Sequence, residues 1–301
     1  MSSEFDAMFR RAVECIDRGE VDGLRQLLDT HSELASERLT EAPAWLRDQV
    51  GDATDGFFNR PYLLWFVAED PIRNGSLPNN IADVIRAIVA AVRRSHPESL
   101  QEQLDSTLQL VCWSGVAADC GLQLDMIDVL VDEGAAPGKN PDNALVNGHV
   151  AAAARLLQRG ATLTLGAALC LGRWSEAERL FVEASAEVKQ FSFVLAALNG
   201  QAEGVSWMIK RGVPLDEPSA DLYSHGTPLH HAVCSGSADT VRVLVEAGAD
   251  VSRADTAWNA TPLGWAEHYE ESTSSTKQQD YTAIAHYLRD RVRKGARATG
   301  Y

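Results

Sequence analysis

The chain has 301 residues, of which 42 are acidic and 27 are basic, giving a formal charge of −15 at pH 7. This excess of carboxylates argues against a nucleic-acid binder, because phosphates are met by clustered lysine and arginine, and against docking on an anionic membrane. With 45% hydrophobic and 23% charged residues, the chain is expected to bury a large core and not to be disordered.

The cysteine usage and the first residues predict a cytoplasmic protein. The cysteines are Cys15, Cys112, Cys120, Cys170 and Cys234. They are widely spaced and form no C-x-x-C or cysteine–histidine pattern, so neither a disulfide framework nor a zinc site is expected. No basic segment followed by an apolar stretch opens the chain, so no secretory signal is expected. No apolar run reaches the roughly 18 residues of a membrane span.

The N-terminal part, residues 1–140, carries helical patterns that repeat only weakly. In three places a turn residue is followed by apolar residues at +5, +8 and +9, which puts three side chains on one helix face. The turn residues are Gly19, Asn80 and Leu122. We expect degenerate helical repeats in this part.

Residues 41–66 interrupt these patterns with a long connection whose second half is aromatic. Its aromatic residues are Phe57, Phe58, Tyr62, Trp65 and Phe66. Such a group can line a ligand pocket. The interpretation that we favour is the core of a capping element, because the terminal units of a repeat array lack a neighbour.

Residues 141–292 repeat the same spacing around glycine pivots. The pivots are Gly148, Gly172, Gly200 and Gly236. A small residue precedes each pivot by four positions, and in three of the four units another glycine follows at +12. That second glycine falls just past the end of the predicted helix, where a left-handed cap is needed. Each unit is therefore expected to be two antiparallel helices joined by a tight turn.

The phrase after Gly226, TPLHHA followed by GADV from Gly248, resembles the ankyrin repeat. Thr227 can cap the first helix of the unit, and Pro228 suits its first position. The phrase restarts at Thr261 with TPL, although Gly264 stands where the family has histidine. A polar insertion at about 270–280 then separates the two helices of this last unit.

The resemblance implies an all-α solenoid of about eight stacked helix-turn-helix units, with short β-hairpin fingers only in the C-terminal repeats. The chain is similar to bacterial-type members of the family, which have degenerate or shortened repeats. The expected organisation is degenerate repeats at 1–140, ankyrin repeats at 141–292 that are clearest at 192–269, and a flexible basic tail at 293–301. The basic residues of the tail region are expected to complement the end of the last helix.

The resemblance also implies a concave surface that binds a partner protein. By position, the predicted partner-binding residues are Asn199, Tyr223, His225, His231, Ser235, Trp258, Asn259, Trp265, His268 and Tyr269. Trp258 is the leading candidate, because tryptophan is enriched at interface hot spots and is hard to explain at a hairpin tip by folding alone. The alternative is that its ring folds back onto its own loop.

The histidines of the last two units allow a second interpretation. His225, His230, His231 and His268 could form a metal site or a general base. The structural interpretation is stronger, because His230 occupies the family position whose ring hydrogen-bonds the backbone. We therefore predict no metal site and no catalytic residues here.

No recognised catalytic or nucleotide-binding string occurs in the sequence. We predict a non-enzymatic, monomeric protein-binding module without a cofactor, which recognises a partner protein whose contact surface is basic. The alternative is an enzyme or a small-molecule-binding protein with a pocket built from the groove histidine, tryptophan and tyrosine residues.

Overall fold

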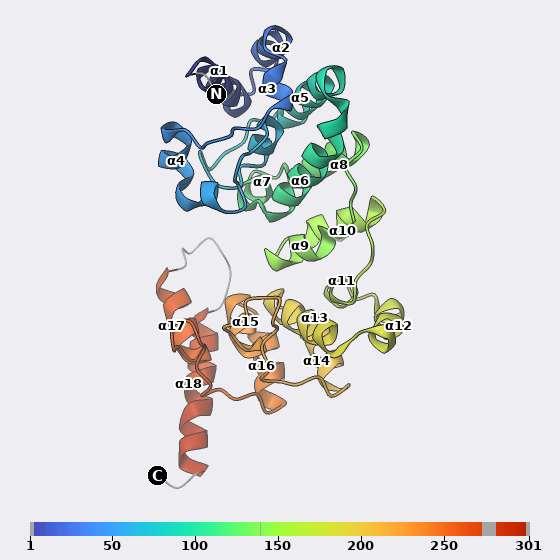
Figure 1. Cartoon of the computed structure of the whole chain (residues 1–301). Helices are drawn as coiled ribbons and strands as arrows, with labels where there is room; N and C mark the ends of the chain where they lie inside the picture. The colour runs from blue at the N-terminus through green and yellow to red at the C-terminus, as the bar shows by residue number, and fades with distance from the viewer. Residues whose placement is uncertain (1–2, 139, 273–280, 299–301) are drawn as a thin grey trace. The chain divides into compact units, whose positions relative to one another are not determined.

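The computed structural model describes residues 3–138, 140–272 and 281–298 (Figure 1). Packing divides the chain into two compact units, Met1–Thr162 and Leu163–Tyr301. This division falls after the position 140–141 expected from the repeat pattern, because the helices that follow residue 139 pack against helices of the first unit. Among these described residues, no helix combines the length and the apolar character that crossing a bilayer requires.

The first unit consists of four stacked pairs of elements. They are α1 (Ser3–Arg18) with α2 (Val21–Thr30), η2 (Leu63–Ala68) with α5 (Ile81–Ser95), α6 (Leu100–Trp113) with α8 (Gln123–Asp132), and α9 (Asn140–Val146) with α10 (Val150–Gln158). The second helices α2, α5, α8 and α10 contact one another in that order. Short elements fill the connections: α3 (Glu33–Ser36), α4 (Ala44–Val50), η1 (Gly51–Asp55), η3 (Pro97–Ser99) and α7 (Gly115–Asp119).

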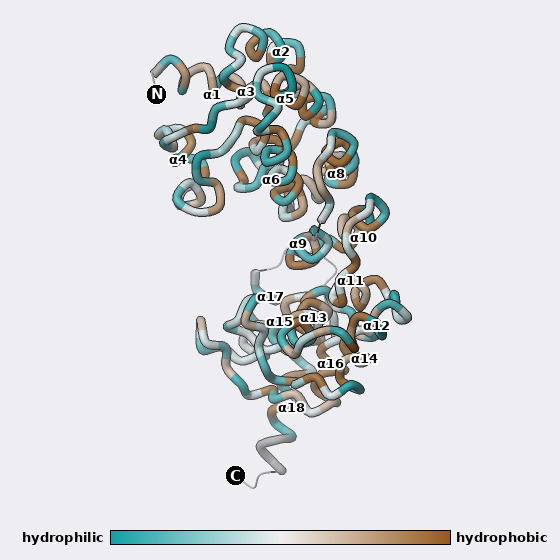
Figure 2. The backbone as a smooth tube through the Cα atoms, turned by 45° about the vertical axis from the view of Figure 1, so that its right-hand side comes forward, coloured by the Kyte–Doolittle hydropathy of each residue, from teal (hydrophilic) through white to brown (hydrophobic). Residues whose placement is uncertain are grey.

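The second unit repeats this plan. Its pairs are α11 (Leu165–Cys170) with α12 (Trp174–Glu183), α13 (Ala186–Leu198) with α14 (Ala202–Ile209), α15 (Pro228–Cys234) with α16 (Ala238–Glu246), and α17 (Pro262–Ser272) with α18 (Tyr281–Ala298). The first helices contact one another in chain order, and so do α14, α16 and α18. The two units together contain the eight predicted pairs. In Figure 2, hydrophobic and hydrophilic residues alternate along the tube within these helices.

The predicted template positions form the core of the second unit. Around the pivot Gly236, the side chains of Ala232, Val241 and Leu244 are fully buried. Gly236 and the +12 glycine, Gly248, have φ values of 72° and 101°, the left-handed conformation that glycine adopts without a Cβ clash. The predicted turn and cap are thereby confirmed.

The aromatic connection in the first unit is mostly core, as we favoured. Phe58, Tyr62, Trp65 and Phe66 are each less than 10% exposed, whereas Phe57 is 50% exposed. The chain around them is more regular than expected, because α4, η1 and η2 lie within it. The element η2 takes the place of a first helix in its repeat.

The predicted β-hairpin fingers are wrong for the residues that the structure describes. These residues contain no strand, and the finger region before α15 holds only an isolated bridge between Ser219 and Leu222. In the next finger, the carboxylate of Asp255 accepts backbone N–H groups that a strand ladder would otherwise use. Local side-chain acceptors of this kind compete with sheet formation.

The C-terminal region also differs from its prediction. Helix α18 continues to Ala298, so it includes the first residues of the expected tail at 293–301. Arg289 pairs with Glu267 at 2.7 Å and Arg291 with Glu246 at 3.8 Å, so these two residues bind neighbouring helices and do not complement the helix end. Residues 273–280 of the predicted insertion and 299–301 lie outside the described residues.

Two glycines allow the cost of backbone strain to be distinguished from the cost of a close contact between repeats. Gly200 and Gly212 both have left-handed φ values, 65° and 75°. A Cβ at Gly200 would lie 2.9 Å from Cβ of Ser237 in the next repeat, whereas a Cβ at Gly212 meets nothing within 4 Å.

We expect Gly212→Ala to lower the free energy of unfolding by about 1 kcal/mol, because of backbone strain alone. We expect Gly200→Ala to lower it by about 1–3 kcal/mol more, because the added Cβ also overpacks the contact between repeats. Urea unfolding followed by circular dichroism checks this, and equal losses would contradict it.

Candidate functional site

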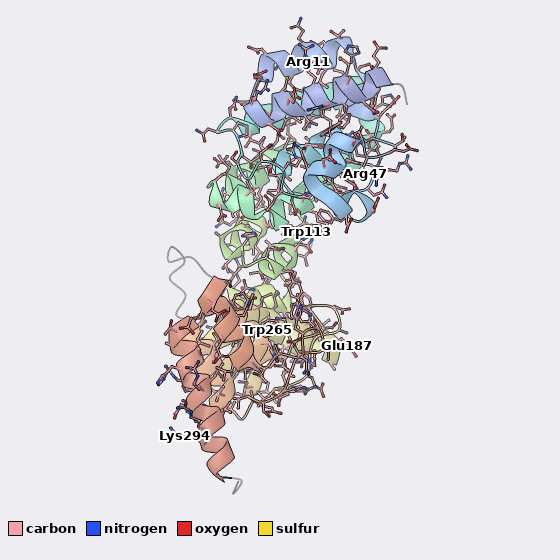
Figure 3. The ribbon with its side chains drawn as sticks, turned by 90° about the vertical axis from the view of Figure 1, so that its left-hand side faces the viewer. Arg11, Arg47, Trp113, Glu187, Trp265 and Lys294 are labelled. Atoms are coloured by element: carbon pink, nitrogen blue, oxygen red, sulfur yellow. The ribbon has the colours of Figure 1, made fainter. Side chains whose placement is uncertain are left out.

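The candidate site is built on the start of α15, the loop before α17 and the first turns of α17. We call Tyr223, His225, His231, Trp258 and Trp265 the aromatic–histidine cluster. The ring of Trp258 lies edge-on to His225 at 4.9 Å and to Trp265 at 5.7 Å between centroids. Trp265, labelled in Figure 3, also contacts His225 at 5.8 Å and His231 at 6.1 Å. Tyr223 closes the group at 6.0 Å from His231.

His230 fixes the loop geometry and is not a free imidazole. Its Nδ1 accepts the backbone N–H of Thr227 at 3.1 Å, so Nε2 is the protonated nitrogen and donates to the carbonyl of Ala260 at 3.0 Å. The ring is fully buried, and burial lowers its pKa. The predicted structural role of His230 is therefore confirmed, and its bond to Ala260 joins two consecutive repeats.

Asp255 organises the loop that carries Trp258. Its carboxylate accepts the backbone N–H groups of Ala257 at 2.8 Å, Trp258 at 2.6 Å and Ala260 at 3.1 Å. It also accepts the indole N–H of Trp265 at 2.9 Å. Burial alone would raise the pKa of this carboxyl, but these hydrogen bonds to the charged form outweigh it and hold the pKa at about 2.

Asp255 is not among the predicted site residues, although one signal in the sequence indicates its role. An aspartate at the start of a short loop commonly accepts the amides two and three residues later, and Ala257 and Trp258 stand at those positions. The bond to Trp265 is formed across ten residues, and no local pattern indicates it.

The backbone of two predicted partner-binding residues lies in the left-handed region. Tyr223 and Asn259 have φ values of 44° and 54°, in a region that residues with a Cβ adopt rarely. Strain of this kind persists where the surroundings over-determine the conformation, and it concentrates at functional sites. The surroundings here are the turn bond from Gly226 N to Tyr223 O at 3.1 Å and the Asp255 hydrogen bonds.

The side chains of the cluster range from mostly exposed to buried. Trp258 is 68% exposed and Tyr223 is 47% exposed. His231 is only 2% exposed, and its Nε2 has no hydrogen-bond partner in the part of the chain that the structure describes. Burial, followed by the neighbouring His225 and His230, lowers the pKa of His231 to about 4. The cluster therefore presents an aromatic surface above a neutral histidine.

The other predicted site residues divide into two groups. Tyr269 contacts Trp265 at 6.4 Å and His268 at 5.7 Å, so these two residues extend the cluster along α17. Ser235 instead binds the carbonyl of Ala232 at 2.7 Å. Asn199 donates to the carbonyl of Leu195 at 2.8 Å. Ser235 and Asn199 lie at helix–helix turns.

Metal chemistry gains no support from the geometry. Within residues 3–138, 140–272 and 281–298, no group of three or more histidine, cysteine or carboxylate side chains is arranged to hold a metal ion. The nitrogens of His230 are both used by the backbone, which leaves them no capacity for a ligand.

Comparison with known proteins identifies repeats in the second unit. Residues 167–255 match the family model described as ankyrin repeats (3 copies). The solved structure of the human ASB11 ankyrin repeat domain is similar at 18% identity over 66% of this chain and 92% of that chain, with a TM-score of 0.30. A TM-score of this size does not establish a shared arrangement of the two chains. Comparison with curated proteins gives no match. Ankyrin repeats are thus present at 167–255, which spans α11 to α16.

The buried His231 makes stability depend on pH. Its pKa of about 4 in the fold lies below the ordinary 6.5, so between these values the unfolded chain binds a proton that the folded chain does not. The free energy of unfolding therefore falls as the pH drops from 6.5 to 4, by roughly 3 kcal/mol for this group. We expect His231→Leu to flatten that dependence in urea unfolding measured across this range. The exposed His268 provides the control, and equal flattening by His268→Gln would contradict the assignment.

Proposed function

We propose that the second unit is a protein-binding module whose contact surface is the aromatic–histidine cluster. The observation that carries this proposal is Trp258, which is 68% exposed while the loop beneath it is tied down by Asp255. A large side chain that is held in place but left in solvent adds little to folding. It is suited to binding, because tryptophan and tyrosine anchor most interface hot spots.

The geometry favours recognition without rearrangement. Both ends of the loop are fixed, one by the Asp255 carboxylate and the other by the bond from His230 to Ala260. A surface that is ordered before association loses less conformational entropy when it binds. The contacts of Trp258 with His225 and Trp265 also show that its ring packs on the cluster, and yet most of its surface stays open. Part of the Trp258 ring is therefore packed on the cluster, and the proposed partner contact is made by the exposed remainder.

The net charge of the chain indicates the charge of the partner that it would bind. The formal charge of −15 repels acidic proteins and speeds encounter with a basic one. Ankyrin repeats generally act as binding modules, and no enzyme family matches, so we propose a non-catalytic role with a basic protein partner. A binding role on this surface requires neither a cofactor nor a second copy of the chain.

Substituting Trp258 tests the proposal. We expect Trp258→Ala to weaken binding of a partner roughly ten-fold or more, because an anchor is removed, and to change the free energy of unfolding by less than about 0.5 kcal/mol. Partners recovered by affinity capture from the native source would be quantified and then titrated as purified proteins. The matched control is Val182→Ala, since Val182 is 76% exposed on α12 outside the cluster. If both variants bind as the wild type does, Trp258 is not the anchor.

The role of Asp255 is tested separately from that of Trp258. Asparagine has one acceptor oxygen, whereas Asp255 uses both oxygens. We expect Asp255→Asn to speed hydrogen exchange at the amides of residues 257–260, to cost about 2 kcal/mol of stability, and to weaken partner binding although Trp258 is intact. Unchanged exchange in this loop, measured by mass spectrometry, would contradict the proposed ordering.

A further inference from the structure

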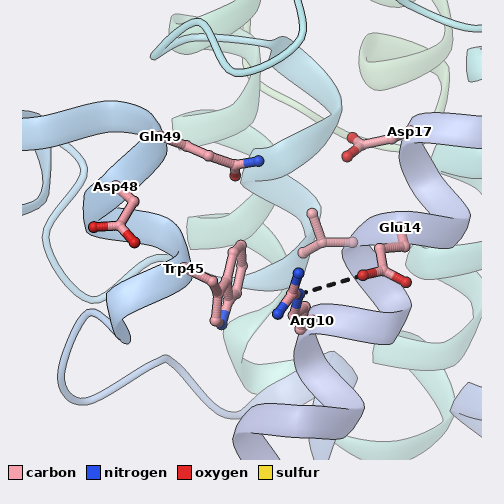
Figure 4. Close-up of a pocket in the computed structure, with 7 residues that line it drawn as sticks. Arg10, Glu14, Asp17, Trp45, Asp48 and Gln49 are labelled. Carbon is pink, nitrogen blue, oxygen red and sulfur yellow. Dashed lines mark ion pairs between the residues drawn. The ribbon is translucent and has the colours of Figure 1, made fainter.

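A pocket in the first unit and the aromatic–histidine cluster differ in how far their polar groups are already used. The pocket, of about 470 Å³, lies between α1 and α4 (Figure 4). Two of its carboxylates are paired within the chain, Glu14 with Arg10 at 3.3 Å and Asp17 with Arg73 at 2.8 Å. The exposed rings of the cluster instead carry polar atoms that bind nothing in the described part of the chain. The cluster is therefore the more available of the two surfaces.

Two rings form the exposed part of the cluster, and both pack on His225. The centroid of the Tyr223 ring lies 6.3 Å from that of His225, and the centroid of the Trp258 ring lies 4.9 Å from it. Among the described residues, these two rings contact His225 but not each other. The Asp255 carboxylate holds the loop beneath Trp258, and the turn bond from Gly226 holds the backbone of Tyr223. The cluster thus presents two fixed aromatic rings that are joined through one imidazole.

The free polar atoms of these two rings can donate hydrogen bonds. The indole N–H of Trp258 and the hydroxyl of Tyr223 make no hydrogen bond with any other residue that the structure describes. An indole N–H can only donate. The backbone carbonyls beside the rings already accept, that of Tyr223 from Gly226 at 3.1 Å and that of His225 from Thr256 at 2.9 Å. The surface therefore suits a ligand that offers acceptors and a face that stacks on aromatic rings.

These properties distinguish between three common ways in which a peptide binds a protein. An added β-strand needs an unpaired strand edge, and residues 3–138, 140–272 and 281–298 contain no strand. The backbone carbonyls of an α-helix are used within the helix, so a docked helix would offer few of them to Trp258 or Tyr223. A polyproline II segment has free carbonyls, and its prolines have no N–H that needs an acceptor. Such segments also dock on aromatic side chains, so polyproline II matches this surface best.

We propose that the aromatic–histidine cluster binds a proline-rich segment of the partner protein in the polyproline II conformation, an assignment that rests on the binding role proposed above for this cluster. Prolines one turn apart in this conformation are separated by about 9 Å. One proline stacks on Trp258 and another on Tyr223, and the indole N–H donates to a carbonyl of the segment. Basic residues flank the segment, because the chain itself is acidic. A segment that is extended before binding loses little entropy on a rigid surface.

The test uses the peptide RPPAPPAPPR and a counterpart in which glutamine replaces every proline. Both peptides carry the same charge, but only the first favours polyproline II. Binding of the fluorescein-labelled peptides to the full chain is measured by fluorescence anisotropy. We expect the proline peptide to bind with a Kd below about 1 mM and the glutamine peptide to bind about ten-fold more weakly or worse. We also expect the unlabelled proline peptide to shift the indole N–H resonance of Trp258 in NMR spectra, assigned from its loss in Trp258→Phe.

Substitutions at Trp258 separate the ring from its donor. We expect Trp258→Ala to weaken binding of the proline peptide about ten-fold or more. Trp258→Phe keeps an aromatic ring and loses the N–H, so we expect a loss of about two- to ten-fold. The matched control is Phe57→Ala, because Phe57 is an aromatic residue of the first unit, outside the cluster, that is 50% exposed. A change below about two-fold is expected for this control.

The polyproline II assignment is overturned if the proline peptide does not bind, if both peptides bind equally well, or if Trp258→Ala and Phe57→Ala have the same effect. Its failure can be told apart from failure of the proposed function, which is tested with the captured partner protein. If the captured partner depends on Trp258 and the proline peptide does not bind, the assignment fails and the binding role stands. If neither the captured partner nor the peptide depends on Trp258, both fail.

Discussion

The constraint on which the molecule depends is that a pair of short helices cannot bury its apolar face alone. In the second unit every first helix contacts the next, and Ala232, Val241 and Leu244 are buried in a core that the repeats share. The close approach sets the side-chain size at the turns, as the contact between Gly200 and Ser237 shows. Polar groups at the ends of a repeat must then form hydrogen bonds with the neighbouring repeat. The exposed aromatic–histidine cluster is positioned by such hydrogen bonds.

The hydrogen bond between His230 and Ala260 contributes both to the packing of two repeats and to the geometry of the candidate site. It fixes the start of α15 against the loop before α17, and Asp255 fixes the remainder of that loop. Trp258 is consequently positioned by groups that are themselves buried. The residues that hold the loop are therefore not those that face solvent.

The repeat pattern could be predicted from sequence, because it depends on spacing alone. The helix pairs and the buried positions around Gly236 follow from local periodicity, whereas the role of His230 was implied by the resemblance of its phrase to the ankyrin repeat. The β-hairpin fingers were predicted wrongly, because the resemblance alone implied them; the loop before α17 is held instead by hydrogen bonds to the Asp255 carboxylate. The cluster was predicted only in part: Ser235 belongs to a turn, and the bond from Asp255 to Trp265 depends on how α17 enters its helix.

The acidic residues have two different roles in the structure. In the second unit the buried carboxylate of Asp255 accepts four N–H groups and has no basic side chain among those partners, so its charge serves the backbone. In the first unit, carboxylates such as Glu69 hold internal guanidinium groups against aromatic rings. A carboxylate beside an aromatic ring favours a guanidinium, because the guanidinium plane stacks on the ring while its N–H groups pair with the carboxylate. The placement of each carboxylate, and not the total of −15, therefore determines which groups it holds.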